Sequence, residues 1–227
     1  MLNLYYNFCK SDAIRCKDLK TLTDGKPLCP YEDCVRNAVM IYGEQIGLEY
    51  MKTLKVNGRE YEIVKLLGKG KGGYSYLAKK DDKEYVLKQI HHEPCSYYQF
   101  GDKIQSELND YDRLRKIGIR MPAMIDVDVE NERILKEYIE GDTIYDLVLN
   151  DKMQDEYLDQ VKEMCALLYP ANTNIDYFPT NFVVCDGKIF YIDYECNDYM
   201  EEWNFENWGI KYWSKTEEFM KYVEEHK

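Results

Sequence analysis

Three polar residues in the second half of the chain carry oxygen atoms at a spacing suited to phosphate chemistry. Asp176 and Asn181 bound the sequence Asp-Tyr-Phe-Pro-Thr-Asn, and Asp193 follows a stretch with the pattern of a hairpin. Phosphoryl transfer requires a carboxylate near the attacking hydroxyl and oxygen ligands that hold magnesium across the phosphates. A turn aspartate or a cap asparagine would explain each residue separately. The three together predict a phosphoryl-transfer site that supplies such a carboxylate and oxygen ligands for magnesium.

A glycine-rich segment lies upstream, between two predicted strands. Its backbone can approach phosphates closely because glycine has no Cβ atom. Gly68, Gly70 and Gly73 satisfy the pattern G-x-G-x-x-G, and Gly72 adds a fourth glycine. A dinucleotide-binding fold would place a helix directly after this pattern, whereas a second strand follows here. This context favours a loop that covers phosphates, although a glycine-rich hairpin explains the motif equally well by itself.

A lysine and a glutamate between these two regions are candidates for holding a nucleotide. Period-two alternation puts Lys88 on the strand face of Val86 and Ile90, where an ammonium group requires an anionic partner. Glu107 falls within the apolar stripe of a predicted helix and would supply a carboxylate. An exposed edge strand and a helix rim are the plainer explanations. A strand lysine paired with a helix glutamate is, however, a required part of kinase sites.

Hydrophobic periodicity and turn signals predict the elements that position these residues. Short strands come first, then one helix closed by Gly118, two more strands, and a mainly helical remainder with an embedded hairpin. The Asn57-Gly58 and Asp186-Gly187 pairs are typical of two-residue hairpin turns. The predicted strands are 61–67, 74–79, 84–90, 123–129 and 133–139, the helix is 103–117, the hairpin is 182–192, and the tail 203–225 is mostly helical.

Composition narrows the possible partners. The chain has 227 residues, with 42 acidic against 30 basic ones and a net charge of −12. The basic residues are scattered, so no electrostatic footprint for nucleic acid is present. The apolar runs are strand-sized, well short of the ~20 residues of a membrane span, and no signal segment is recognisable. We expect a soluble cytoplasmic protein that binds neither nucleic acid nor a membrane.

Half of the eight cysteines fall in the first 34 residues. Four thiolates would suit a tetrahedral structural zinc site, although their spacing is looser than paired C-x₂-C motifs. Without zinc, the same side chains would serve as buried apolar residues. The candidate zinc ligands are Cys9, Cys16, Cys29 and Cys34.

Residues 60 to 210 resemble the protein-kinase-like superfamily, which includes eukaryotic-type protein kinases and the aminoglycoside and choline kinases. The resemblance rests on the glycine loop, on Lys88 with Glu107, on the Asp-x-x-x-x-Asn segment, and on Ile-Asp-Tyr-Glu around Asp193, which is similar to the I-D-F-E of choline kinases. It implies that Lys88 contacts nucleotide phosphates and pairs with Glu107. It also implies that Asp176 accepts the acceptor's proton while Asn181 and Asp193 bind magnesium.

The same resemblance implies where adenine binds. Glu137-Tyr138-Ile139 is similar to the kinase hinge, so the backbones of Glu137 and Ile139 would contact adenine. The glycine loop also aligns in a second register, G-x-G-x-F-S, through Gly70, Gly72 and Ser75. In that register Tyr74 becomes the aromatic residue of the loop.

Departures from the superfamily pattern leave the acceptor open. Asn174 stands where the catalytic loop usually has histidine, and Phe178 stands where protein Ser/Thr kinases carry lysine. No A-P-E sequence follows, and only 34 residues come after Asp193, so the peptide-binding region looks reduced. Acidic and aromatic residues after Asp193 would suit a cationic acceptor, or would form a solvated loop beside packed rings. They include Glu195, Asp198, Glu201, Glu202, Tyr194, Tyr199, Trp203 and Trp208.

We therefore predict an α+β, two-lobed protein-kinase-like fold with a five-stranded antiparallel N-lobe sheet and a reduced helical C-lobe. The predicted division is a cysteine-containing appendage over 1–57, an N-lobe over 58–140 and a C-lobe over 141–227. The predicted activity is that of an atypical kinase that moves the γ-phosphoryl of ATP, with Mg²⁺, to a protein Ser/Thr or a small-molecule alcohol. The alternatives are a pseudokinase or nucleotide-binding module without catalysis, and a zinc-dependent scaffold.

Overall fold

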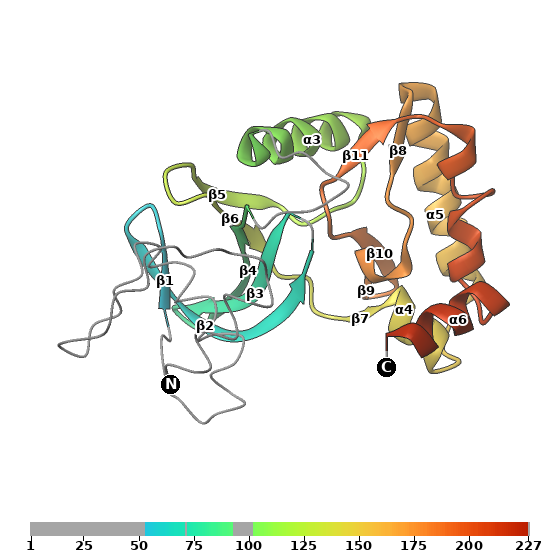
Figure 1. Ribbon diagram of the computed structural model, residues 1–227, viewed down its shortest axis with the longest axis horizontal. Coiled ribbons are helices and arrows are strands. Elements are labelled where there is room, and N and C mark those ends of the chain that lie inside the picture. Colours follow the sequence, from blue (N-terminus) through green and yellow to red (C-terminus); the bar gives the residue numbers. More distant parts are fainter. Residues whose placement is uncertain (1–52, 71, 93–101, 227) are drawn as a thin grey trace, which may run out of the picture. The chain divides into compact units, whose positions relative to one another are not determined.

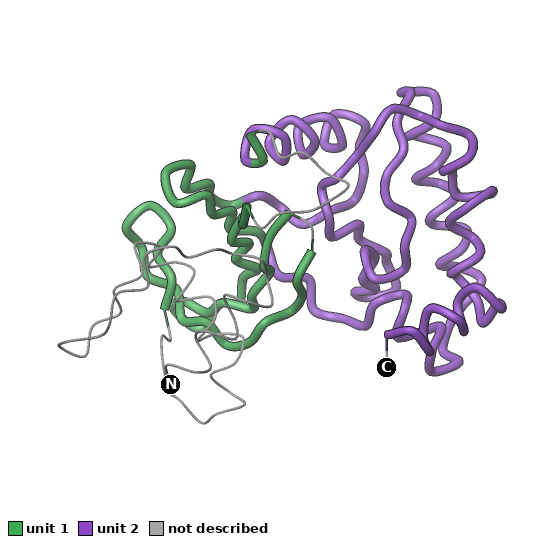
Figure 2. Tube along the Cα trace, in the orientation of Figure 1, with its two compact units in different colours: residues 1–103, 125–136 green, residues 104–124, 137–227 purple. Residues whose placement is uncertain are grey.

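The computed structural model describes residues 53–70, 72–92 and 102–226, which fall into two compact units (Figure 2). Unit 1 takes its described residues from 1–103 and from 125–136, and unit 2 takes them from 104–124 and 137–227. The candidate zinc ligands lie outside the described residues, so the zinc site stays a prediction. They are Cys9, Cys16, Cys29 and Cys34.

Unit 1 is built on a curled antiparallel sheet of six strands in the order β1-β2-β3-β4-β6-β5 (Figure 1). The prediction of five strands is wrong, because a short strand within the predicted appendage pairs with the long second strand. Exposed and buried residues alternate over only four positions in this first strand, and so short a run is not recognisable in the sequence. The strands are β1 Thr53–Val56, β2 Arg59–Lys69, β3 Gly73–Lys80, β4 Lys83–Ile90, β5 Met124–Asp128 and β6 Arg133–Glu137.

The predicted turn at Asn57-Gly58 is confirmed. It joins β1 to β2, and both residues have left-handed backbone conformations with φ of 47° and 77°. Such a turn matches the twist of antiparallel strands, and glycine adopts it without steric cost. The sheet then buries an apolar cluster on one face, because alternate residues point to the same side. The cluster comprises Leu54, Val56, Tyr61, Tyr74, Tyr76, Ala78, Leu87 and Leu135.

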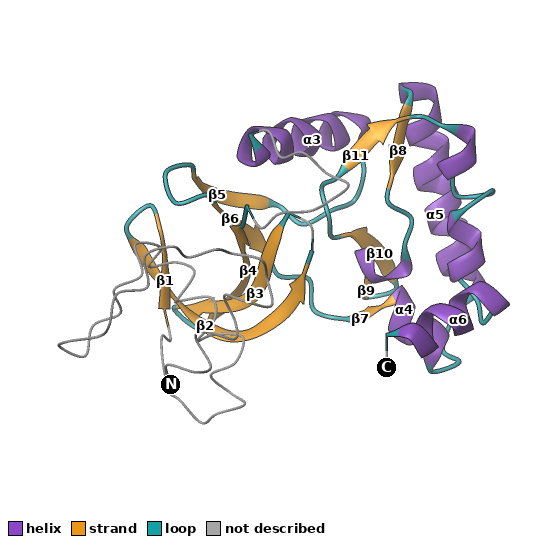
Figure 3. Cartoon of the chain, in the orientation of Figure 1, coloured by secondary structure: helices purple, strands orange, loops and turns teal. Residues whose placement is uncertain are grey.

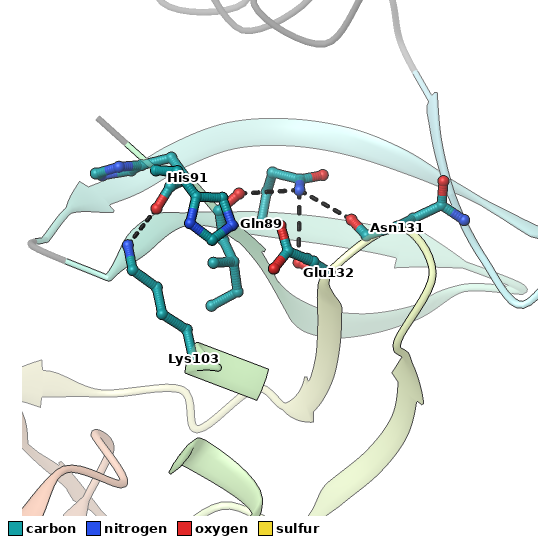
Figure 4. Close-up of polar contacts among 7 residues, drawn as sticks. Gln89, His91, Lys103, Asn131 and Glu132 are labelled. Carbon is teal, nitrogen blue, oxygen red and sulfur yellow. Dashed lines mark hydrogen bonds and ion pairs between the residues drawn. The ribbon is translucent and has the colours of Figure 1, made fainter. Parts of the chain in front are cut away.

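Polar side chains fix the β4 end of this sheet (Figure 4). Gln89 is buried, and its amide nitrogen donates to the carbonyl oxygens of Asn131 at 3.1 Å and Glu132 at 3.4 Å. Its amide oxygen accepts from Arg133 Nε at 2.5 Å. Because a buried amide is costly to leave without partners, these bonds specify how the turn between β5 and β6 sits against β4.

Unit 2 combines four helices with five short strands among its described residues (Figure 3). β7, β9 and β10 form one small sheet in the order β10-β9-β7, and β8 pairs with β11. The helices are α3 Lys103–Ile117, whose first residue falls in unit 1, α4 Ile144–Leu149, α5 Asp155–Leu168 and α6 Glu217–Glu225. The strands are β7 Asp142–Thr143, β8 Thr173–Ile175, β9 Phe182–Cys185, β10 Lys188–Tyr191 and β11 Cys196–Asp198.

An apolar core fills unit 2. The predicted α5 stripe lies in this core through Val161, Cys165 and Leu168, with Leu158 packed against it. The tail differs from the prediction, because only α6 is α-helical there and short 3₁₀ turns cover 201–203 and 209–212. Across the parts of the chain that the structure describes, no helix combines the length and apolar character needed to cross a membrane.

Candidate active site

Backbone hydrogen bonds close the glycine loop between β2 and β3. Gly70 N donates to Gly73 O at 2.9 Å, and His91 N donates to Gly72 O at 3.4 Å. Gly68 lies before the turn and still pairs with Ser75 in the β2–β3 ladder. The strand-loop-strand arrangement expected from the sequence is therefore present, with its tip between Gly70 and Gly73.

The four glycines of the loop serve different purposes. A Cβ atom at Gly73 would lie 2.5 Å from a backbone oxygen of β4, so a side chain there would disrupt the β3–β4 pairing. At Gly68 and Gly70 it would meet nothing within 4 Å among the described residues. At Gly72 it would meet Lys88, with Nζ at 3.8 Å. Gly73 is thus required by the sheet, whereas the other three leave room for a close approach by phosphates.

Lys88 lies in one cross-strand row with two other predicted residues of unit 1. It faces Ser75 on β3, and Ser75 faces Gly68 on β2. Directly opposite residues point to the same face of a sheet, so these three side-chain positions are brought together. Tyr74 points to the other face, where its ring is 1% exposed and stacks with Tyr76. Tyr74 is consequently a core residue and not an exposed aromatic tip.

His91 is a loop contact that the sequence reasoning missed. Its Nε2 lies 3.0 Å from Gly70 O, so the tautomer protonated at Nε2 donates to the loop. The imidazole also packs against Tyr74, with ring centroids 5.0 Å apart. Lys103 Nζ donates to the His91 carbonyl oxygen (Figure 4). No local sequence motif marks a histidine at a strand end as a contact of the glycine loop. The available signal was its position directly after β4.

In unit 2, Asp176, Asn181 and Asp193 converge at one end of the β9–β10 hairpin. Ile192 N donates to Asn181 O at 2.9 Å, which extends the hairpin ladder by one pair and sets Asp193 just beyond it. Asn181 Nδ2 donates to Asp176 O at 3.3 Å. The turn at Asp186-Gly187 that closes the hairpin is confirmed, with φ of 48° and 72°. The structure therefore brings together the three residues predicted to carry the chemistry.

Neighbouring backbone groups orient both carboxylates. Asp176 Oδ1 accepts from Phe178 N at 3.0 Å, and Asp193 Oδ1 accepts from Tyr194 N at 2.7 Å. Both aspartates are partly buried. Each of these bonds therefore fixes the direction of one carboxylate oxygen.

Buried aromatic residues support the loop that carries Asp176. The Trp213 indole donates to Tyr177 O at 2.8 Å. The Tyr177 ring is fully buried between Phe205 and Gly209, where an added Cβ at Gly209 would lie 2.6 Å from Tyr177 Cβ. Burial raises the pKa of Tyr177, and Cys165 and Tyr169 raise it further. The loop that carries Asp176 is therefore anchored in the core of unit 2.

Three predicted site residues influence one buried phenol of unit 2. Tyr194 donates to Pro122 O at 2.9 Å, and its ring is fully buried. Burial raises the pKa of Tyr194 most, and the neighbouring Tyr111, Glu107, Glu137 and Asp193 raise it further. Glu107 of α3 thus lies in the electrostatic surroundings of the Asp193 loop. Lys88 belongs to unit 1, and its pairing with Glu107 stays a prediction.

The predicted hinge lies at the end of β6. Glu137 N donates to Ala123 O at 2.9 Å, and the Glu137 carboxylate accepts from Ala123 N at 3.1 Å. This double contact ties the end of β6 to the segment before β5. Ile139 follows and is partly buried. Adenine binding by Glu137 and Ile139 stays a prediction.

Asn181 and Asp193 have the donor atoms that a magnesium ion requires. The Asn181 amide nitrogen donates to Asp176 O, so the amide oxygen points away from this contact and is directed at other partners. Magnesium in nucleotide sites is held by one or two protein oxygens together with phosphates and water. Among the described residues no group of three or more His, Cys, Asp and Glu side chains forms a complete metal cage. Two protein ligands plus nucleotide phosphates fit this donor set.

The acidic and aromatic segment after Asp193 separates into core and surface residues. Tyr194 is buried, so it cannot present a ring to an acceptor. Trp203 is 46% exposed and packs on Trp208, whose ring in turn lies 6.5 Å from the Phe178 ring of the Asp176 loop. An aromatic run therefore extends from an exposed tryptophan to the residue two positions after Asp176.

No family model matches this chain. Among curated proteins, the KEOPS complex subunit Bud32 of Pyrococcus abyssi is 27% identical over 85 residues. The match covers 36% of this chain and 39% of that relative's length. This similarity supports a relationship to the protein-kinase-like superfamily, and the mixed α+β architecture is compatible with a kinase-like fold.

Proposed function

We propose that this protein is an ATP-dependent phosphotransferase that moves the γ-phosphoryl group of ATP to a hydroxyl acceptor. The observation that supports this most is the convergence of Asp176, Asn181 and Asp193 at one end of the β9–β10 hairpin. A carboxylate beside two further oxygen donors is the arrangement that phosphoryl transfer uses. The similarity to Bud32 agrees with a kinase-like function.

Asp176 would orient the acceptor hydroxyl and accept its proton. As the bond from the acceptor oxygen to the γ-phosphorus forms and the bond to the ADP oxygen breaks, the acceptor proton passes to the Asp176 carboxylate. The hydrogen bond from Phe178 N holds this carboxylate in place before substrate binds. Such preorganisation lowers the barrier because no reorientation is required during the reaction.

Asn181 and Asp193 would hold magnesium, which would supply positive charge to neutralise the phosphates. The glycine loop would cover the phosphates through Gly68, Gly70 and Gly72, with Gly73 holding the strand pairing behind them. Further nucleotide contacts would come from Ser75, Lys88 with Glu107, Glu137 and Ile139.

Two acceptor classes remain in competition, a protein Ser/Thr and a small-molecule alcohol. Phe178 occupies the position where protein Ser/Thr kinases carry a lysine, and its ring packs against Tyr212 and Tyr222 with centroids 5.1 Å and 4.6 Å away. An aromatic side chain there cannot make the lysine's contact to the transferred phosphate. A panel of acceptors is therefore needed.

A nucleotide-binding pseudokinase is the second candidate, favoured by Asn174 in place of the usual histidine. Asn174 is buried and its amide nitrogen donates to Met200 O at 2.9 Å, so it supports β8 instead of reaching a substrate. Binding of ATP with magnesium distinguishes a nucleotide site from a scaffold without one. It should raise the melting temperature with ligand concentration, following mass action.

The deciding experiment is a magnesium-dependent ATP turnover assay over peptides, aminoglycosides and choline-like alcohols. Wild type should transfer phosphate to one acceptor class, and the Asp176→Ala and Asp193→Ala variants should not. Equal behaviour of all three proteins would sink the catalytic proposal. Stabilisation by ATP and magnesium without transfer to any acceptor would favour the pseudokinase.

A further inference from the structure

One buried side chain joins the two loops that carry the proposed catalytic and metal-binding residues. The Tyr191 hydroxyl donates to Glu195 O at 2.7 Å and accepts from Asp176 N at 3.4 Å. The Tyr191 side chain is completely buried at the end of β10. A single phenol therefore contacts the backbone of the catalytic aspartate and the backbone two residues after Asp193.

The two bonds of this phenol are difficult to replace. A buried carbonyl or amide without a partner costs about 1–3 kcal/mol, so each loop is favoured only in the position that reaches the hydroxyl.

We propose that Tyr191 is a positioning residue that sets the spacing between the Asp176 loop and the Asp193 loop. This inference rests on the proposed phosphotransferase function. The ladder contact between Ile192 and Asn181 fixes one side of the hairpin end, and the Tyr191 hydroxyl fixes the other. Without the hydroxyl, Asp176 keeps its carboxylate but loses its fixed distance from the metal ligands. Misplacement of reacting groups by small distances lowers turnover strongly.

The Tyr191→Phe variant tests this role, with Tyr169→Phe as the matched control. Both changes remove a tyrosine hydroxyl of unit 2 that donates one hydrogen bond and accepts another, but the Tyr169 hydroxyl donates to Glu206 and accepts from Phe205 N. Loss of one buried hydrogen-bonding link predicts a kcat for Tyr191→Phe that is roughly 10-fold lower. The KM for ATP should stay unchanged, and half-maximal turnover should require more Mg²⁺. Tyr169→Phe should keep the wild-type kcat and Mg²⁺ dependence.

Amide exchange at Asp176, followed by NMR, reports the link without relying on turnover. The amide should exchange slowly in wild type and Tyr169→Phe and faster in Tyr191→Phe. If wild type transfers phosphate and Tyr191→Phe matches it in kcat and Mg²⁺ dependence, the positioning role is wrong while the proposed function stands. If no protein transfers phosphate, the proposed function fails, and equal exchange rates in wild type and Tyr191→Phe would remove the link as well. Should Tyr191→Phe not fold, rapid exchange of the Asp176 amide in wild type would overturn the link.

Discussion

The glycine loop of unit 1 and the Asp176 loop of unit 2 are held in place by opposite means. The glycine loop is closed by backbone bonds, and side chains added at Gly68 or Gly70 would meet nothing among the described residues. The Asp176 loop is anchored by buried side chains, with the Trp213 indole hydrogen-bonded to Tyr177 O. The first region has space around two of its glycines among the described residues, whereas the second holds the Asp176 carboxylate through a bond from its own backbone. Substitutions in the two regions should therefore separate nucleotide binding from chemistry and stability.

Asp176→Asn should produce the largest effect and would confirm that unit 2 carries the chemistry. Asparagine keeps an oxygen to accept from Phe178 N, so the loop should stay ordered, but it cannot take a proton. Loss of a general base typically lowers turnover by 10²–10⁴-fold, and we expect a decrease of roughly this size in kcat. Steady-state kinetics checks this, with Asp186→Asn in the hairpin turn as control. A kcat near that of wild type would assign the base elsewhere.

Lys88→Met should weaken ATP binding, whereas Asp176→Asn should lower kcat. Lys88 Nζ lies beside Gly72, so its loss would remove a positive charge from the proposed phosphate site. Hydrogen bonds to charged groups contribute about 1.5–3 kcal/mol, which corresponds to a roughly 10- to 100-fold weaker affinity for ATP. Calorimetry measures this affinity. Lys83→Met, on the same strand at the far turn, removes the same charge and should bind ATP normally; an equal loss in both variants would contradict the assignment.

Gly209→Ala and Gly70→Ala should separate the two regions by stability. The added methyl group at Gly209 would overlap Tyr177, whereas the one at Gly70 has space around it among the described residues. Overpacking of a core typically costs about 1–3 kcal/mol, so the free energy of unfolding should fall by that amount in Gly209→Ala only. Denaturant titration with tryptophan fluorescence reports on unit 2, which holds all three tryptophans, Trp203, Trp208 and Trp213. A stable Gly209→Ala variant would show that the Asp176 loop is not anchored there.

The smallest expected effect concerns pH. The two units should lose stability at opposite ends of the pH scale. In unit 1, burial opposes ionisation of Asp128, but hydrogen bonds from Asn57 and Asn131 outweigh it and lower the pKa of Asp128. The Asp128 carboxylate therefore stabilises unit 1 fully at pH values above the ordinary aspartate pKa of about 3.9. This stabilisation is lost as the pH falls through the lower pKa of the folded state.

In unit 2, burial raises the pKa of Cys165 to about 11 and of Cys196 to about 12. The unfolded thiols ionise from about pH 8.5, so unit 2 should become less stable as the pH rises above that value. Unfolding of wild type from pH 3 to 11, followed by fluorescence for unit 2 and by amide exchange for unit 1, checks both limits. Simultaneous loss of both units at acid pH would contradict this division.

Local signals in the sequence predicted the longer elements and missed the short ones. The bounds of α3 in unit 2 match the predicted helix 103–117, because its apolar stripe ends at Gly118, which has a φ of 94°. β8 and β11 were missed, because each has three residues and they pair across more than twenty positions of the chain. The tail was predicted to be mostly helical, yet tertiary packing of Gly209 against Tyr177 and of Trp213 against Phe205 determines its turns.

The candidate site shows the same division between local and long-range information. Asp176, Asn181 and Asp193 were recognisable because spacing and hairpin turn lie within one short stretch of sequence. Tyr191 and His91 were not recognisable, because their roles depend on which backbone atoms they reach after folding. A tyrosine within an apolar strand gives no sign of what its hydroxyl contacts.

Calorimetric titration of ATP, with and without Mg²⁺, tests most directly whether the two loops of unit 2 hold the metal on the nucleotide. Asp193→Asn is the matched variant, because asparagine keeps an oxygen for the bond from Tyr194 N but loses the charge. We predict that Mg²⁺ strengthens ATP binding to wild type and leaves binding to Asp193→Asn almost unchanged. The same Mg²⁺ effect on both proteins would contradict the assignment of Asp193 as a metal ligand.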